Sequence, residues 1–158
     1  MNTVFAPFTK TEAETFLWYQ VSPRLQLGLA HLGRQNALRY LASVQLSPET
    51  DWFPSVNASV GVQGIGTGNP GYSLSFEKGY GTGDWQAVGY VGVGFRSNEN
   101  HAHPLGGFKV TFDQKLTLGF QHDGHEAHVF LIGQKDRFFG GLYLIKMSRP
   151  AWMIGVRF

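Results

Sequence analysis

The sequence has no cysteine and few charged residues for its length. Without cysteine, disulfides, thiolate nucleophiles and cysteine-ligated metal sites are excluded. Charged residues make up 15% of the 158 residues, whereas an average soluble domain carries roughly 25%. A soluble barrel of this length would need a charged outer coat, which so few charges cannot supply. The formal net charge is only +2, and no basic cluster interleaves with aromatic residues, so we expect no nucleic-acid partner.

Long apolar runs are also missing. No stretch approaches the roughly 18 consecutive apolar residues of a transmembrane helix. The first residues lack the basic region and apolar core of a signal peptide. If the protein is exported, we expect this numbering to represent the chain after a leader has been removed.

The dominant pattern in the sequence is an alternation with period two, which is typical of β-strands. In the last nine residues, Trp152, Ile154 and Val156 share one face, and Ala151, Met153 and Gly155 share the other. Similar alternation recurs along the chain, separated by turn signals such as Ser22-Pro23, Gly81 to Asp84 and His122-Asp123-Gly124. Helical periodicity is weak, and the 21 glycines disfavour helices.

These runs predict one all-β domain over residues 1–158, built as an antiparallel up-and-down barrel of about twelve strands. Ten strands is the alternative, because the first two patterns are the least regular. The expected strands lie near residues 3–10, 14–22, 24–33, 37–47, 53–65, 71–80, 85–97, 106–113, 115–122, 126–134, 137–147 and 151–158. Spacings of ten to fourteen residues per strand suit a meander.

The composition of the two faces indicates which one meets lipid. The apolar face carries Leu, Val, Phe, Tyr and Trp, whereas the other carries mostly Gly, Ser, Thr, Gln, Asn and Ala. A soluble barrel would place charged residues on its second face. Small polar residues suit a narrow interior, and large apolar ones suit a wall that faces lipid. The aromatic residues near expected turns, among them Trp18, Trp52 and Trp85, are typical of interfacial girdles. The sequence therefore favours a transmembrane barrel.

The C-terminal run Trp152-Met153-Ile154-Gly155-Val156-Arg157-Phe158 resembles the terminal strand of bacterial outer-membrane β-barrels. The resemblance implies a protein of the bacterial outer membrane whose C-terminal strand is read by the barrel-assembly machinery. It also implies a periplasmic C-terminus. Counting back from it, residues 97–104 and 122–126 would lie outside the cell, and residues 81–84, 113–115 and 134–136 would face the periplasm.

Several charged residues fall on the expected interior face and are the candidate lumen-lining residues: Arg39, Glu77, Arg96, Lys109, Asp113 and Arg157. They could line a narrow channel, or they could pair and plug it. In the strands at 126–134 and 137–147 both faces are apolar. Their inward residues could form a plug-like core or line a lipid-sized pocket.

Two histidine clusters lie in expected outer loops. One contains His101 and His103, and the other contains His122, His125 and His128. The second set is the candidate metal site, because imidazoles near carboxylates can bind Zn, Ni or Cu. A polar surface loop is the simpler interpretation, and we expect no cofactor. No catalytic residue is predicted either, because the order of Ser97, Asn98 and His101 does not match the His-before-Ser order of outer-membrane lipid hydrolases.

The sequence thus predicts a small outer-membrane barrel that acts as a passive pore or as a structural envelope protein, with lipid as its surroundings. One alternative is a lipid-modifying enzyme or a carrier of apolar ligands at the outer membrane. Another is a soluble lipocalin-like barrel whose apolar face points inward.

Overall fold

The computed structural model describes residues 2–6, 12–62 and 69–157, and it describes the side chains of all of these except residues 2–6, 12 and 62. Within these ranges the chain forms β-strands and no helix. The strands are β1 (Asn2–Ala6), β2 (Glu12–Ser22), β3 (Leu25–Leu32), β4 (Ala37–Ser47), β5 (Ser55–Val62), β6 (Pro70–Thr82), β7 (Trp85–Arg96), β8 (His103–Phe112), β9 (Leu116–His122), β10 (Ala127–Lys135), β11 (Phe138–Ile145) and β12 (Arg149–Val156).

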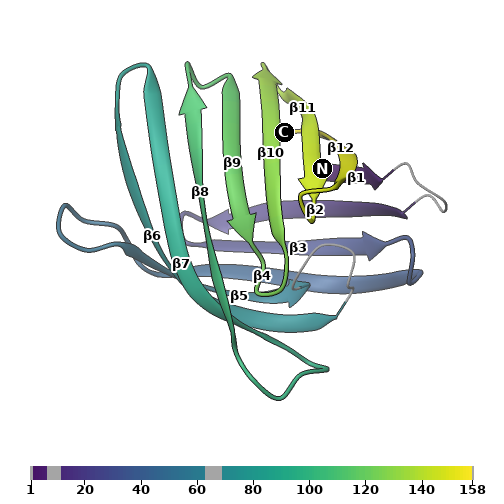
Figure 1. Cartoon of the computed structure of the whole chain (residues 1–158). Coiled ribbons are helices and arrows are strands. Elements are labelled where there is room, and N and C mark those ends of the chain that lie inside the picture. Colours follow the sequence, from purple (N-terminus) through teal and green to yellow (C-terminus); the bar gives the residue numbers. More distant parts are fainter. Residues whose placement is uncertain (1, 7–11, 63–68, 158) are drawn as a thin grey trace.

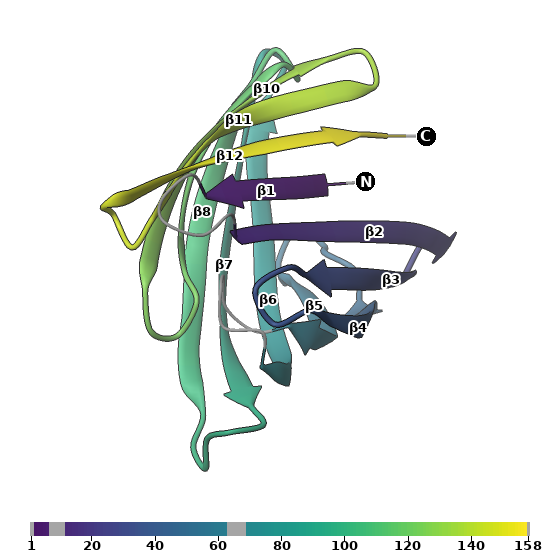
Figure 2. The same cartoon turned by 90° about the vertical axis from the view of Figure 1, so that its right-hand side faces the viewer.

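Eleven strands, β2 to β12, form one antiparallel sheet in which each strand pairs with the next in the sequence. The short strand β1 pairs with β2 through Thr3↔Thr15 and with β12 through Thr3↔Ile154. The sheet curves strongly, so that β2–β5 run nearly across β6–β9, and the two chain ends lie side by side (Figures 1 and 2). The prediction of an all-β antiparallel meander is confirmed.

Each expected strand overlaps an observed one, but one boundary was wrong. Strand β8 was expected to start at residue 106 and instead starts at His103, which pairs with Gly94. The expected loop of residues 97–104 is therefore shorter, and His103 lies in the sheet. Parts of the first and fifth expected strands, residues 7–10 and 63–65, and the terminal Phe158 lie outside the described residues.

The connections alternate between two ends of the sheet. The first, here called the hairpin end, contains residues 23–24, 48–54, 83–84, 113–115 and 136–137. The second, called the loop end, contains residues 33–36, 97–102, 123–126 and 146–148. This grouping agrees with the expected separation of residues 81–84, 113–115 and 134–136 from residues 97–104 and 122–126.

Two tight turns each place two successive residues in the left-handed backbone conformation. Asp113 and Gln114 have φ values of 48° and 56°, and Lys146 and Met147 have φ values of 55° and 54°. In the first of them, the N–H of Lys115 donates to the carbonyl oxygen of Phe112 at 2.9 Å. Phe112 pairs with Leu116, so this three-residue connection fixes the register of β8 against β9 over their whole length.

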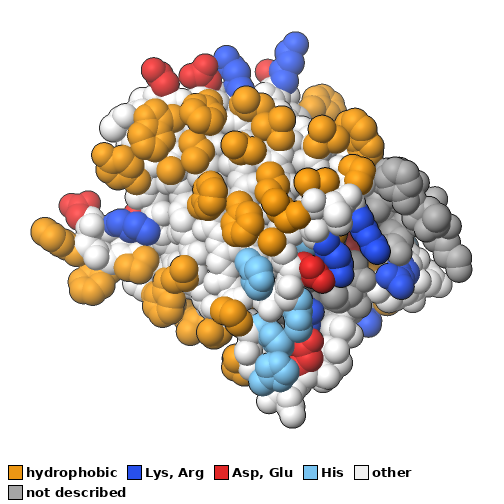
Figure 3. Space-filling model, in the orientation of Figure 1, with side chains coloured by type: hydrophobic (Ala, Val, Ile, Leu, Met, Phe, Trp, Pro, Cys, Tyr) orange, Lys and Arg blue, Asp and Glu red, His pale blue; other side chains and the backbone are white. Residues whose placement is uncertain are grey.

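The outer face of the sheet is a continuous apolar wall. One in-register row across β8 to β12 consists of Val110, Leu118, Leu131, Leu142 and Trp152. A second row, across β2 to β7, consists of Tyr19, Leu27, Ala42, Val60, Tyr72 and Phe95. Most of these side chains are exposed, for example Tyr19 at 71% and Leu118 at 46%. Figure 3 shows this wall as a band of hydrophobic side chains between charged groups at one edge and a histidine cluster at the other.

The inner face carries small residues and a limited core. Among the described side chains, the buried hydrophobic ones are Ala30, Leu32, Leu41, Tyr143 and Ala151. Phe16 packs against the first three. All of these lie toward the loop end of their strands. Side chains therefore fill the interior at that end.

The apolar inward residues of β10 and β11 belong to the same packed region. The rings of Phe130 and Tyr143 stack with centroids 5.4 Å apart. Phe130 lies directly over Gly119, where an added Cβ would be 2.2 Å from the ring. Glycine is required at that position because the ring takes the space of a side chain.

Candidate functional site

The most distinctive polar cluster lies at the loop end and is formed by Glu99, His103 and His125. Glu99 lies in the connection between β7 and β8, His103 begins β8, and His125 lies between β9 and β10. The Glu99 Oε2 atom is 2.6 Å from His103 Nε2, and Glu99 Oε1 is 3.0 Å from His125 Nε2. One potential ligand atom from each residue lies within 4.8 Å of the others. We call this set the His–Glu cluster; Figure 3 shows histidine and acidic side chains gathered at this edge of the molecule.

The loop that carries His125 is ordered by Asp123. The Asp123 Oδ1 atom accepts hydrogen bonds from the backbone N–H groups of His125 at 3.0 Å and Glu126 at 2.9 Å. Gly124, between Asp123 and His125, has a φ of 99°, which a side chain would strain. The Asp-Gly pair therefore forms a tight turn that places the His125 ring 4.1 Å, centroid to centroid, from that of His103.

A second layer of polar groups lies beneath the His–Glu cluster. Arg96 is buried, with its guanidinium 3.9 Å from Glu99 Oε1 and 3.6 Å from Asp123 Oδ1. It also donates to the Asp123 carbonyl oxygen at 3.2 Å. His128 is 1% exposed, with Nε2 3.4 Å from Asp123 Oδ2. Its Nδ1 accepts the Lys146 backbone N–H at 3.2 Å. The layer thus joins β7, β10 and the two loops nearest them.

These contacts determine the charge of the two carboxylates. Burial raises the pKa of Glu99, but the hydrogen bond with His125 and the nearby charges of His103 and Arg96 outweigh it, so the pKa is lowered overall. For Asp123, burial is likewise outweighed, by hydrogen bonds from His128 and from the backbone of Glu126 and His125. The pKa of Asp123 lies far below its ordinary value. Both groups are therefore anionic at neutral pH.

The histidines predicted as a metal site separate in the structure. His122 accepts the Gly124 backbone N–H at 3.2 Å, and His128 faces Asp123 in the buried layer. Only His125 joins the His–Glu cluster, where its partners are Glu99 and His103. Sequence analysis assigned His103 to a separate group and gave Glu99 no role.

The six predicted lumen-lining residues do not form one network. Arg96 is buried in the polar layer described above, whereas Arg39 and Glu77 are half-buried on β4 and β6. Lys109 is exposed on β8, and Asp113 is exposed in the turn that follows it. Arg157 follows β12, with its guanidinium carbon 5.8 Å from the centre of the Phe139 ring. Among these six, all of which are described, no ion pair joins two of them.

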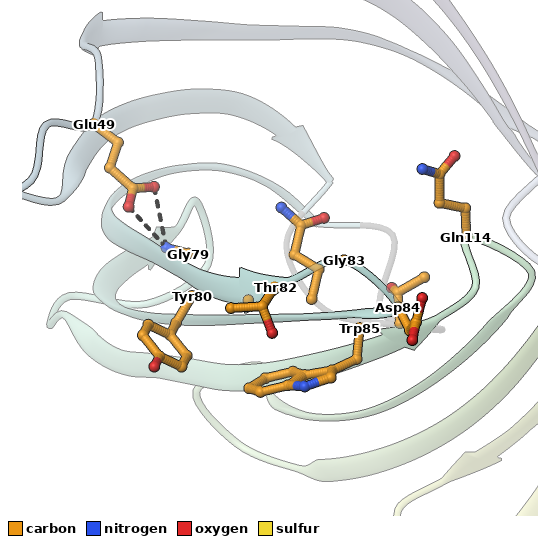
Figure 4. A pocket seen from close by; sticks show the side chains of 11 residues that line it. Glu49, Gly79, Tyr80, Thr82, Gly83, Asp84, Trp85 and Gln114 are labelled. Atoms are coloured by element: carbon orange, nitrogen blue, oxygen red, sulfur yellow. Dashed lines mark hydrogen bonds between the residues drawn. The ribbon is translucent and has the colours of Figure 1, made fainter.

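A second polar site lies at the hairpin end, in a cleft of about 420 Å³ lined by Glu49, Gly79, Tyr80, Asp84, Trp85 and Gln114 among others (Figure 4). The Glu49 carboxylate accepts the Gly79 backbone N–H at 3.1 and 3.0 Å and pairs with Lys78 at 3.1 Å. Lys78 and then Gly79 lower the pKa of Glu49. This contact attaches residues 48–54 to the part of β6 that extends beyond β5. The polar cleft is therefore explained as a structural contact between this loop and β6.

No protein-family model, curated protein or solved structure matches this chain. The described residues contain no helix long and apolar enough to cross a membrane.

Proposed function

We propose that this chain is a transmembrane β-barrel of the bacterial outer-membrane type that serves as a structural envelope protein with a closed or very narrow lumen. The observation that carries the proposal is the apolar outer wall. Exposed Leu, Val, Phe, Tyr and Trp side chains continue from strand to strand along two in-register rows. In water, such a surface far exceeds the few hundred Å² of contiguous apolar patch that a monomer tolerates.

Strand pairing supports the same proposal. Lipid offers no hydrogen bonds, so a sheet can span a membrane only if its edge strands are paired. Strand β1 pairs with both β2 and β12, as closure of the meander into a barrel would require. Six of the described strands, β2, β4, β6, β7, β8 and β10, have 9 to 13 residues and so reach the roughly 9–11 residues that a tilted strand needs to cross a bilayer, and the other strands are shorter.

The packing of side chains on the inner face supports a barrel with a filled lumen rather than an open pore. Leu32, Leu41, Tyr143 and Arg96 are all buried near the loop end. Small barrels are filled by side chains in this way, whereas porins keep an aqueous lumen. The lipocalin-like alternative would need the reverse arrangement, with the large apolar side chains buried inside the barrel.

One observation also argues against the alternative of a lipid hydrolase. The His128 ring uses Nδ1 to accept a backbone N–H, and its Nε2 faces Asp123. Neither nitrogen faces a serine hydroxyl, which a general base in such an enzyme must do.

The proposed partners are outer-membrane lipid and, during assembly, the barrel-assembly machinery that would read the C-terminal strand.

The test is refolding of the purified chain with and without detergent micelles or liposomes. We expect a β-rich circular dichroism spectrum and a heat-modifiable band on a gel only when amphiphile is present. Planar-bilayer recordings on the refolded protein should then show little current. A monodisperse β-rich monomer in plain buffer would contradict the membrane assignment. A large, steady conductance would leave that assignment intact and would instead replace the structural role with a pore.

A further inference from the structure

We propose that Glu99, His103 and His125 bind a divalent transition-metal ion, for which Zn²⁺ is the natural probe. The three side chains offer two imidazole nitrogens and a carboxylate, which is a ligand set that proteins use for zinc. They come from two different loops, so the ion would link the β7–β8 connection to the β9–β10 connection. The inference does not depend on the proposed membrane role, because the ligands lie in the connections and at the first residue of β8.

The spacing of the ligand atoms suits a tetrahedral ion. Bonds of about 2.0–2.1 Å to nitrogen and oxygen place the ligand atoms of a tetrahedral site about 3.3–3.4 Å apart. Here Glu99 Oε2 lies 2.6 Å from His103 Nε2 and Glu99 Oε1 lies 3.0 Å from His125 Nε2, and one ligand atom from each of the three residues lies within 4.8 Å of the other two. Ligation therefore requires only small side-chain adjustments.

Two buried atoms lack hydrogen bonds and thereby indicate a ligand. Glu99 Oε2 and His103 Nε2 are inaccessible to solvent and make no well-directed hydrogen bond, although they face each other. The His103 side chain is only 10% exposed. Buried polar atoms are nearly always satisfied in folded proteins. A metal ion between the two atoms would satisfy both.

The surrounding charge also favours a cation. Metal ligation uses neutral imidazoles, and the formal charges of the other groups, Glu99, Asp123 and Arg96, are −1, −1 and +1, which sum to −1. Arg96 is the one cation close to Glu99 in the described polar layer, and it also pairs with Asp123 at 3.6 Å. Asp123 therefore draws the arginine charge away from the ligand atoms.

A fourth coordination position is open to solvent or to His101. The His101 ring lies 4.4 Å, centroid to centroid, from the His103 ring, and His101 is exposed. Zinc sites with three protein ligands usually complete their shell with water. Removal of His101 should therefore weaken binding less than removal of any of the three proposed ligands.

The experiment is a Zn²⁺ titration of the tag-free full chain, refolded in detergent micelles, by calorimetry and by competition with a chromophoric chelator. We expect one ion per chain. The variants Glu99→Gln, His103→Ala and His125→Ala should each weaken binding by more than the roughly 10- to 100-fold that loss of an outer-shell partner costs. Wild-type protein should also gain thermal stability with Zn²⁺, and the variants should not.

The matched control is His31→Ala, which removes an exposed histidine on β3, outside the His–Glu cluster and its loops, and should bind Zn²⁺ like the wild type. His125 is the most exposed ligand, so His125→Ala is the variant best able to fold, and circular dichroism will verify that it does. Absence of Zn²⁺ binding to folded wild-type protein would overturn the proposal. Binding that survives in folded His125→Ala, or that is lost in His31→Ala, would overturn it as well.

Discussion

Substitution of adjacent residues in β9 tests which face of the sheet meets lipid. Leu118 lies at the centre of an outward triplet, Leu116, Leu118 and Phe120, and its register partners on both sides are the apolar Val110 and Leu131. It is 46% exposed. Thr117 is half-buried on the opposite face, where its hydroxyl lies 3.0 Å from that of Thr111.

The expected costs differ because the two faces meet different surroundings. A lipid-facing arginine near the midplane costs about 2–4 kcal/mol. Since about 1.4 kcal/mol is a factor of ten, Leu118→Arg should lower the folding equilibrium in liposomes roughly 30- to 900-fold. Thr117→Arg loses one hydroxyl hydrogen bond, worth about 0.5–1.5 kcal/mol, and places its charge on the inner face, which is polar near the hairpin end.

The assay is urea titration of each variant in liposomes, with the heat-modifiable gel band as the measure of the folded fraction. The wild type and Thr117→Arg should unfold at similar urea concentrations, and Leu118→Arg should fold poorly at any concentration. Equal midpoints for the two variants, or a greater loss for Thr117→Arg, would mean that the faces are assigned incorrectly.

Three other substitutions test individual contacts. Gly119→Ala should destabilise the protein by about 1–3 kcal/mol, because the new methyl group overlaps the Phe130 ring; an unchanged urea midpoint would exclude this contact. Gln114→Gly should stabilise it by about 0.5–1 kcal/mol, because glycine adopts the φ of 56° without the cost that a side chain incurs; a lower midpoint would contradict this. Glu49→Gln should speed hydrogen exchange of the backbone N–H groups of residues 50–53 at pH 7. Since the pKa of Glu49 is lowered from 4.5, its contribution is complete above that pH and is lost on further acidification, so wild type and variant should converge only below about pH 4.5; equal exchange at pH 7 would refute the tie to Gly79.

Much of the fold could be predicted because strands carry a local signal. The alternation in β4 assigns Leu38 and Tyr40 to one face and Arg39 and Leu41 to the other. The structure agrees, with Tyr40 82% exposed and Leu41 buried. Such a pattern needs only neighbouring residues, since successive side chains point to opposite faces. It does not reveal that Leu41 packs with Ala30 and Leu32, because that depends on curvature of the sheet.

The charged residues of the interior were harder to predict because their pairing is not local. Arg96 was expected to line a narrow channel or to pair with other charged residues of the interior face. Instead, its partners are Glu99, three residues later, and Asp123, which β8 and β9 bring back to it. Asp113 continues the alternation of β8, which assigned it to the interior face, but it lies in the 113–115 turn with a left-handed conformation.

Part of the His–Glu cluster could have been predicted from the sequence by one further inference. In the β8–β9 hairpin, paired residue numbers add to 228, as in Gly106↔His122 and Phe112↔Leu116. His103 and His125 have the same sum, so a tight turn centred on Gln114 places them at matching positions beyond the paired region. The turn at residues 113–115 was itself predictable. Combining it with two-residue alternation would have joined the two histidine groups, and only Glu99, on the folded loop above them, required the structure.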